Sequence, residues 1–212
     1  LKAVAEVSME LFPGELCGLI GPNGAGKTTF FNLLTGVYIP SEGTIHLEDE
    51  KLNKLPPYKI TRKGISRTFQ NIRLFGDLSV IDNVKVAYHS QAKHSMFSSI
   101  VRLPTHFSGE KEMDQKAFDF LKIFNLETYR DEKAKNLPYG MQRRLEIARA
   151  LAANPRLLLL DEPAAGMNPK ETSQLMELIG FIREKFNLTV LLIEHDMQLV
   201  MGVCERIYVL DH

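Results

Sequence analysis

A nine-residue run near the amino terminus constrains the fold of this chain more than any other segment. Residues 21–29 match the pattern G-x-x-x-x-G-K-[ST] of a phosphate-binding loop, and they read Gly21, Pro22, Asn23, Gly24, Ala25, Gly26, Lys27, Thr28 and Thr29. The apolar run 16–20 before the loop predicts a strand, and residues 28–34 after it predict a helix. In that order, backbone N–H groups and the positive end of the helix dipole point at one anion.

This loop predicts a nucleotide site with defined roles for two side chains. Lys27 is expected to lie along the β- and γ-phosphates, and the Thr28 hydroxyl is expected to bind Mg²⁺. The alternative is a chance match, which at a glycine frequency of about 7% arises in about one chain in a hundred. The flanking strand and helix favour nucleotide binding over that alternative.

Composition limits the classes of protein that this chain can belong to. It has 212 residues, 44% of them hydrophobic, which suits one soluble globular domain with room for a subdomain. Basic and acidic residues balance at 26 each, which argues against nonspecific nucleic-acid binding. No apolar run approaches about 18 residues, so the chain is not expected to cross a membrane. Cys17 and Cys204 lie in apolar runs and are expected to be packing residues.

Apolar runs alternate with helical patterns along much of the chain. Strands are expected at 16–20, 44–47, 65–69, 157–160, 189–193 and 206–210, and a half-buried strand of period two at 7–11. Asn168, Pro169 and Glu171 predict a helix start, as an N-cap, a first-turn proline and a capping partner. The alternation predicts an α/β fold with a parallel sheet.

Residues from about 76 to 151 differ from the rest of the chain in their sequence pattern and predict a mostly helical subdomain. Ser79 with Asp82 predicts a helix start before residues 80–89, and residues 90–109 are expected to form a loop or a short helix. Apolar residues then recur at helical spacing, and we interpret them as ordinary core: Met113, Ala117, Phe120, Leu121 and Phe124.

Polar residues directly follow two of the predicted strands. Ligands of parallel sheets bind beyond the carboxyl ends of the strands, so Asp161, Glu162 and His195 are expected to converge with the phosphate-binding loop. Asp161 is placed to bind Mg²⁺, and Glu162 to orient and deprotonate an attacking water. His195 is expected to contact the γ-phosphate, a capping or surface role being the alternative.

Residues 137–151, LPYGMQRRLEIARAL, resemble the signature motif and following helix of ABC ATPases. With the phosphate-binding loop, Gln70, Asp161-Glu162 and His195 in order, nearly the whole chain is similar to an ABC nucleotide-binding domain. Within that family it most resembles the ATPase subunit of branched-chain amino-acid importers. This finer resemblance is carried by RTFQ at 67–70, RLF at 73–75, the run 143–149, PAAGMNPKET at 163–172 and LIEHDM at 192–197. The ATPases of lipopolysaccharide exporters are the nearest alternative.

The resemblance implies a P-loop NTPase core with a parallel sheet, an antiparallel β part near the N-terminus and an inserted α-helical subdomain. The core would comprise residues 1–75 and 152–212, residues 76–151 would carry the signature motif, and both ends of the chain are expected to be trimmed. The resemblance also implies ATP hydrolysis with Mg²⁺, which Thr28, Asp161 and Gln70 would bind. Lys27, Gln70, Glu162 and His195 would form the catalytic set.

Two such domains pack head to tail in the family, so a second ATPase subunit is an implied partner. Each ATP site then uses the phosphate-binding loop of one subunit and the signature motif of the other. The signature motif here is Pro138, Tyr139, Gly140, Met141 and Gln142. Pro138 replaces the usual serine and lacks both a hydroxyl and a backbone N–H, while Met141 replaces the usual glutamine. We therefore expect this motif to contribute less to the site that it completes on its partner.

The resemblance further implies integral membrane permease subunits as partners, and through them a substrate-binding protein. The chain would then be peripheral, on the cytoplasmic face of the cell membrane, with no nucleic-acid partner. Phe69, Ile72, Leu74 and Phe75 are expected to help form a groove for a short helix of the permease, plain subdomain core being the alternative. The aromatic residue that stacks on adenine in the family has no counterpart before Phe12.

Two other functions fit parts of the sequence less well. A soluble ABC ATPase acting on ribosomes or DNA would usually carry tandem domains, or heptad insertions with a Cys-x-x-Cys hook. This chain has one phosphate-binding loop and neither of the other features. A nonhydrolysing nucleotide-gated module is disfavoured by the presence of Asp161, Glu162 and His195.

Overall fold

The computed structural model describes residues 4–91 and 104–211. The chain divides into two compact units, one made of Leu1–Asn71 with Pro155–His212 and the other of Ile72–Asn154. The sequence predicts the boundaries at 75–76 and 151–152, a few residues from the observed ones. Each unit has its own secondary structure and its own buried residues.

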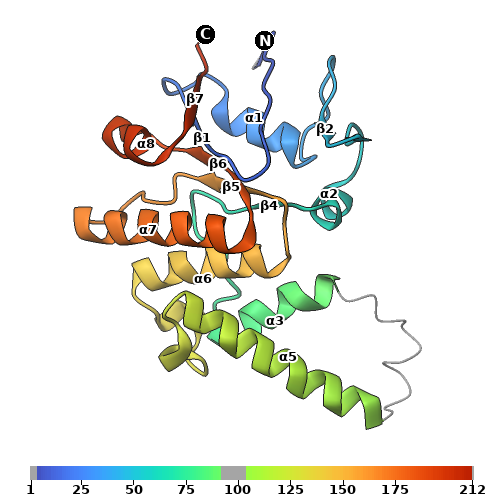
Figure 1. Cartoon of the computed structure of the whole chain (residues 1–212), viewed down its shortest axis with the longest axis vertical. Helices are drawn as coiled ribbons and strands as arrows, with labels where there is room; N and C mark the ends of the chain where they lie inside the picture. The colour runs from blue at the N-terminus through green and yellow to red at the C-terminus, as the bar shows by residue number, and fades with distance from the viewer. Residues whose placement is uncertain (1–3, 92–103, 212) are drawn as a thin grey trace. The chain divides into compact units, whose positions relative to one another are not determined.

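The first unit is built on a five-stranded parallel sheet, drawn in Figure 1. Its order is β4 (Ile65–Arg67), β5 (Leu157–Asp161), β6 (Thr189–Ile193), β1 (Leu16–Ile20) and β7 (Arg206–Val209). Every adjacent pair is parallel, so the carboxyl ends of all the strands lie at one edge. The parallel sheet expected from the sequence is confirmed, although β4 ends two residues before the predicted limit at 69.

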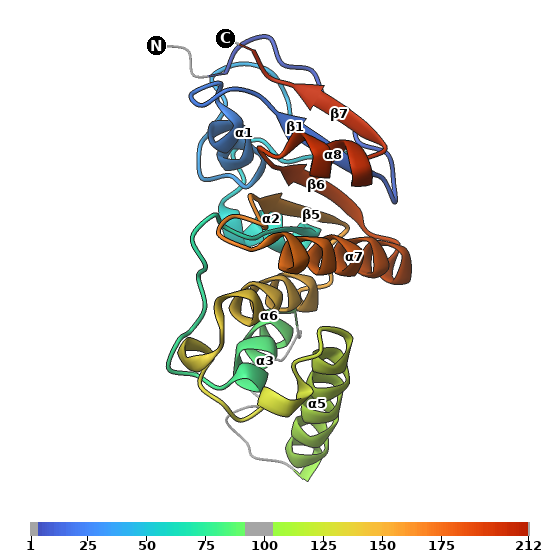
Figure 2. The same ribbon diagram turned by 90° about the vertical axis from the view of Figure 1, so that its left-hand side faces the viewer.

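Helices cover both faces of this sheet, which is why its central strands are apolar throughout. Phe31 of α1 (Lys27–Leu34) belongs to the buried cluster that contains Cys17 and Leu19 of β1. On the opposite face, a Cβ at Gly18 would lie 2.8 Å from a Val200 side-chain carbon of α8 (Met197–Val203). Figure 2 shows α1 and α8 on the two sides of β1. Glycine at position 18 therefore sets how closely α8 packs on the sheet.

Two further helices belong to the first unit. The helix α2 (Pro57–Lys63) leads into β4, and α7 (Pro169–Phe186) joins β5 to β6. The predicted start of α7 is confirmed: the Asn168 side chain accepts a hydrogen bond from the Glu171 backbone, and the Glu171 side chain accepts one from Asn168.

The strand predicted at residues 7–11 is wrong. The burial alternates as expected, with Val7, Met9 and Leu11 packed against the core and their neighbours exposed, but these residues form no strand. In the described part of the chain, the antiparallel structure of the first unit is the short pair β2 (His46–Leu47) and β3 (Glu50–Lys51). Alternating burial therefore reflects contact with the core here, without a neighbouring strand to supply ladder hydrogen bonds. The strand predicted at 44–47 shortens to β2.

The second unit is helical. It contains α3 (Val80–Gln91), α5 (Pro104–Ile123), the short 3₁₀ helices Glu127–Tyr129 and Ala134–Asn136, and α6 (Tyr139–Ala152). The backbone of Asp82 donates to the Ser79 hydroxyl, so the predicted cap of α3 is confirmed. The predicted stripe is core at Ala117, Phe120 and Leu121 of α5 and at Phe124 just after it, whereas Met113 is half-buried.

Of the two alternatives expected for residues 90–109, a loop or a short helix, both described ends are helical. Residues 90 and 91 extend α3, and residues 104–109 form the first turns of α5, since proline is well tolerated at the start of a helix. The remainder of that prediction, residues 92–103, lies outside the described residues.

Buried polar side chains fix the segment that opens the second unit. Asn83 of α3 is fully buried, and its amide both accepts from the Phe75 backbone N–H (3.0 Å) and donates to the Phe75 carbonyl (3.1 Å). Glu146 of α6 accepts from the Arg73 backbone N–H at 3.0 Å and from the buried Arg143 guanidinium at 2.7 Å. Residues 73–75 are thereby attached to both α3 and α6.

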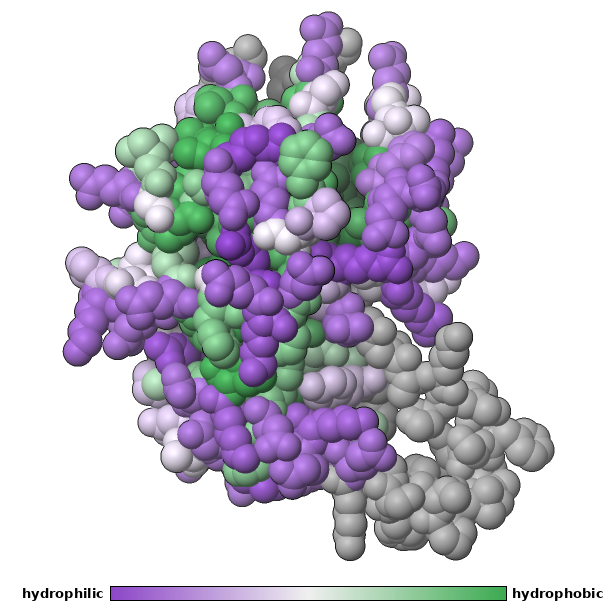
Figure 3. Space-filling view, viewed as in Figure 1, coloured by the Kyte–Doolittle hydropathy of each residue, from purple (hydrophilic) through white to green (hydrophobic). Residues whose placement is uncertain are grey.

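Hydrophilic side chains predominate on the face shown in Figure 3. Among the described helices, none combines the length and the hydrophobicity that a membrane span requires.

Candidate functional site

The phosphate-binding loop joins β1 to α1, as its sequence predicts. Gly24 and Gly26 have φ of 89° and 91°, a left-handed region that residues with a Cβ enter at a cost. At Gly21 a Cβ would lie 2.4 Å from the carbonyl oxygen of Leu210. The helix begins directly after Gly26, and no side chain in the described part of the chain caps it. The first-turn N–H groups are therefore free to face an anion.

Lys27 and Thr28 stand at the start of α1. The Lys27 ammonium is buried and donates to the carbonyls of Gly21 (2.6 Å) and Pro22 (2.9 Å), so its charge lies over its own loop. Thr28 is exposed to solvent.

Asp161 ends β5 and is buried against a cation that the sequence analysis did not assign. The Arg67 guanidinium donates to Asp161 Oδ2 at 2.7 Å and to Asn32 Oδ1 at 2.6 Å. It also lies over the rings of Phe31 at 5.3 Å and Phe69 at 5.0 Å. Arg67 therefore joins β4, β5 and α1 around the carboxylate that is predicted to bind the metal.

Glu162 is the centre of a second cluster at the same edge. Its Oε1 lies 2.6 Å from His195 Nε2, and its Oε2 accepts from the Gln70 amide at 2.7 Å. The Glu162 backbone has φ of 46°, which is strained for a residue with a side chain, and its N–H donates to the Ile193 carbonyl at 2.9 Å. Three predicted site residues, from the segments after β4, β5 and β6, are thus in direct contact.

Glu194 is a further buried carboxylate that the sequence analysis did not assign. It is 6% exposed, its Oε1 accepts from the Ala164 backbone N–H at 2.9 Å, and its Oε2 accepts from the His195 backbone N–H at 3.3 Å. Burial raises the pKa of Glu194, and the two backbone hydrogen bonds oppose that rise. The sequence alone carries no signal for this burial, since a charged residue directly after an apolar strand is usually solvated.

The structure brings most of the predicted site residues to one edge of one sheet. The strands that lead to Gln70, Asp161-Glu162, His195 and the phosphate-binding loop are β4, β5, β6 and β1, which are successive neighbours. The predicted convergence is therefore observed, while the chemical roles of these side chains stay predictions.

The signature residues Pro138, Tyr139, Gly140, Met141 and Gln142 lie in the second unit, at the start of α6. Pro138 is the N-cap and has no side-chain hydrogen bond to the helix. Gln142 turns back and donates to the Leu137 carbonyl at 2.8 Å. Within the described residues no side chain caps this helix, and in its first turn the Met141 N–H donates to the Pro138 carbonyl at 2.9 Å.

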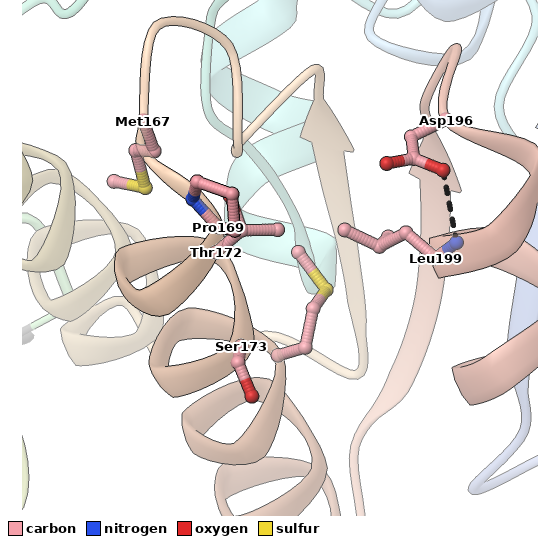
Figure 4. A pocket seen from close by; sticks show the side chains of 7 residues that line it. Met167, Pro169, Thr172, Ser173, Asp196 and Leu199 are labelled. Carbon is pink, nitrogen blue, oxygen red and sulfur yellow. Dashed lines mark hydrogen bonds between the residues drawn. The ribbon is translucent and has the colours of Figure 1, made fainter.

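A hollow of about 310 Å³ lies between the start of α7 and α8 (Figure 4). It is lined by Met167, Pro169, Thr172, Ser173, Met176, Asp196 and Leu199. None of these residues belongs to the predicted site. The dashed bond in Figure 4 is the Leu199 N–H donating to Asp196 at 3.2 Å, part of the N-cap of α8.

A phosphate-binding loop at the end of a parallel strand, with acidic and histidine residues at the ends of neighbouring strands, defines a P-loop nucleoside triphosphatase. The family model described as ABC transporter matches residues 4–165, and the chain belongs to that family. It is accordingly an ATP-binding and ATP-hydrolysing protein of the ABC class.

Several characterised proteins are similar to this chain over nearly its full length. LivG of Escherichia coli K12, a high-affinity branched-chain amino acid transport ATP-binding protein, is 51% identical over 100% of this chain and 83% of its own. BraF of Pseudomonas aeruginosa, with the same description, is 46% identical over the same shares. LptB of Escherichia coli K12, a lipopolysaccharide export system ATP-binding protein, is 35% identical over 99% of this chain and 81% of its own.

Solved structures agree with this assignment. The ADP conformation of MJ1267, an ATP-binding cassette of an ABC transporter, superposes with a TM-score of 0.82 at 31% identity, covering 98% of this chain and 81% of that one. A dimeric structure of MJ0796, a bacterial ABC transporter cassette, gives a TM-score of 0.81 at 28% identity, covering 98% of this chain and 86% of that one.

Proposed function

We propose that this chain is the ATP-hydrolysing subunit of an importer for branched-chain amino acids. The contact of Glu162 with both Gln70 and His195, at the sheet edge that carries the phosphate-binding loop, supports the hydrolytic part. The 51% identity to LivG, against 35% to LptB, favours amino-acid import over lipopolysaccharide export.

Residues 21–29 would bind ATP, with the backbone N–H groups and Lys27 holding the phosphates. A hydroxyl from Thr28, an amide oxygen from Gln70 and a carboxylate from Asp161 are the hard oxygen donors that Mg²⁺ prefers, so the donor set fits that ion. Arg67 engages Asp161 through Oδ2, which makes Oδ1 the proposed donor. When bound, Mg²⁺ would neutralise charge that develops on the phosphates.

Glu162 is the proposed base for the attacking water. Gln70 engages one of its carboxylate oxygens and His195 the other, so its orientation is fixed from both sides before a water binds. His195 is 46% exposed against 16% for Glu162, which leaves the imidazole able to contact the γ-phosphate as well. Positioning of this kind is the main demand of phosphoryl transfer.

The assignment of Glu162 can be tested by replacing it with glutamine. The amide keeps the shape of the side chain but cannot accept a proton, so phosphate release should fall at least about a hundredfold while binding of a fluorescent ATP analogue persists. Glu177→Gln, an exposed change on α7, is the control and should leave both measurements unchanged. Hydrolysis at the normal rate in Glu162→Gln would remove Glu162 as the base.

We further propose a second ATPase subunit as a partner, with residues 138–142 of each chain acting on the ATP of the other. The reported dimer of MJ0796, a similar cassette, supports this arrangement. The two compact units would then correspond to the ATPase core and the signature-bearing helical subdomain.

Integral membrane permease subunits, working with a substrate-binding protein, are the other proposed partners, at the cytoplasmic face of the cell membrane. Phe75 is 47% exposed, and its ring centroid lies 5.2 Å from the guanidinium carbon of the half-buried Arg149, so the ring offers an apolar surface to a partner. Phe75→Asp should abolish co-purification with the permease while ATP binding persists. Phe181→Asp, at an aromatic residue 50% exposed in the other unit, is the matched control and should retain the permease. Intact co-purification in both variants would count against a docking role for Phe75.

The substrate is tested in the assembled transporter. ATP-dependent uptake of radiolabelled leucine, isoleucine and valine should require an intact Lys27. A transporter that takes up none of these amino acids and exports a lipopolysaccharide would support the alternative that resembles LptB. The 35% identity to LptB is the observation behind that alternative.

A further inference from the structure

The loops that follow β5 and β6 are joined at several points in the structure. The Glu162 N–H donates to the Ile193 carbonyl at 2.9 Å, and the Glu162 carboxylate contacts the His195 ring at 2.6 Å. Glu194 supplies two further links, to the backbone N–H of Ala164 and to that of His195. These links between the two loops all involve three consecutive residues, 193–195.

Burial of the Glu194 carboxylate carries a free-energy cost. Burying a carboxylate is unfavourable unless hydrogen bonds compensate for lost water, and Glu194 is 6% exposed. The rise in its pKa has burial as its largest cause. A serine or threonine at this position could accept one backbone hydrogen bond with a smaller desolvation penalty. Only a carboxylate supplies two acceptor oxygens, one for each loop.

The loop after β5 is the one that needs such a link. Glu162 has φ of 46°, and strained backbone persists only where the surroundings determine it. The next residues turn tightly, with the Ala165 N–H donating to the Glu162 carbonyl at 3.2 Å. The bond from Ala164 to Glu194 lies inside that turn, two residues from Glu162. It therefore anchors the strained turn to the loop that carries His195.

We propose that Glu194 is a positioning residue for ATP hydrolysis: its buried carboxylate ties the turn after β5 to the backbone of His195 and so sets the imidazole against Glu162. The inference rests on the roles proposed above for Glu162 and His195. Glu194 itself touches no reacting atom. Its effect is on the rate of the chemical step, whereas ATP binding depends on residues 21–29.

The test compares Glu194→Gln with the wild-type chain, measuring ATP affinity, steady-state phosphate release and thermal unfolding on each purified protein. Glutamine has the same shape but one acceptor oxygen, so one of the two backbone N–H groups loses its partner. The kcat should fall about tenfold or more, while the Kd for ATP stays within about twofold. Glu15→Gln is the matched control, because Glu15 is also a buried carboxylate, 5% exposed, but precedes β1 at the opposite edge of the sheet. It should leave kcat unchanged.

A double-mutant cycle separates positioning from general stability. If Glu194 acts through His195, then adding Glu194→Gln to His195→Ala should lower kcat by less than about twofold beyond His195→Ala alone. A full additional loss in the double variant, or an unchanged kcat in Glu194→Gln, would overturn the proposal. Normal hydrolysis in His195→Ala would instead refute the role of His195, and with it this route of action. If Glu194→Gln does not unfold cooperatively, Glu194→Asp replaces it in the same double-mutant cycle. Aspartate keeps the charge but is one methylene shorter, so its oxygens lie farther from the two backbone N–H groups.

Discussion

Replacing Arg67 with methionine should destabilise the chain strongly, because it leaves the Asp161 carboxylate buried without its cation. The two side chains are 6% and 5% exposed, so solvent screens their charges little. Removing one partner of a buried ion pair costs about 3–5 kcal/mol. The two ring contacts of the guanidinium add about 0.5–2 kcal/mol, part of which the methionine side chain recovers by packing.

The assay is urea denaturation followed by far-UV circular dichroism, with the free energy of unfolding taken from the midpoint and slope. Lys63→Met is the control, since Lys63 pairs with the exposed carboxylate of Glu50, and surface pairs contribute little. Adding Asp161→Asn to Arg67→Met removes the unpaired charge and should restore part of the lost stability. The reasoning is refuted if Arg67→Met shifts the midpoint no more than Lys63→Met, or if Asp161→Asn restores nothing.

Three further outcomes are expected. Restoring the usual signature residues with Pro138→Ser and Met141→Gln should raise ATP hydrolysis in the assembled transporter, measured as phosphate release, and an unchanged rate would contradict the weakened-signature hypothesis. Gly18→Ala should cost about 1–3 kcal/mol in urea denaturation, because the added methyl group would overlap α8, and a neutral result would mean that α8 moves freely. Burial raises the pKa of Cys204 from the ordinary 9.0 to about 12. Cys204 of the native protein should therefore react with iodoacetamide at pH 8 far more slowly than in the unfolded protein, and its reaction should speed up as the pH rises towards that pKa. Equal rates in both states would contradict the burial argument.

The sheet and the edge that carries the site could be predicted from the sequence for a physical reason. Strands covered on both faces must be apolar throughout, and the polar residues that follow them can only lie at the carboxyl edge. That reasoning places Asp161, Glu162 and His195 at the edge where the motif at residues 21–29 places the phosphate-binding loop. The strand predicted at 7–11 failed because alternation reports which side chains contact the core and not which backbone groups pair.

Arg67 and Glu194 could not be given roles from the sequence, because what matters about each is a contact distant in the chain. Arg67 and Asp161 are 94 residues apart, and Glu194 and Ala164 are 30 residues apart. A charged residue beside an apolar run is usually solvated, and only the fold shows that both of these are buried. The contacts of Gln70 and His195 with Glu162 likewise follow from the three-dimensional fold and not from the sequence.

The attachment of residues 73–75 to two helices has a mechanical consequence. The Asn83 amide of α3 forms hydrogen bonds with the Phe75 backbone, and the Glu146 carboxylate of α6 accepts one from the Arg73 backbone. A shift of residues 73–75 would therefore break these bonds or displace α3 and α6. Residues 138–142 open α6. A force that a partner applied at Phe75 would therefore reach the helix that carries residues 138–142 through these hydrogen bonds.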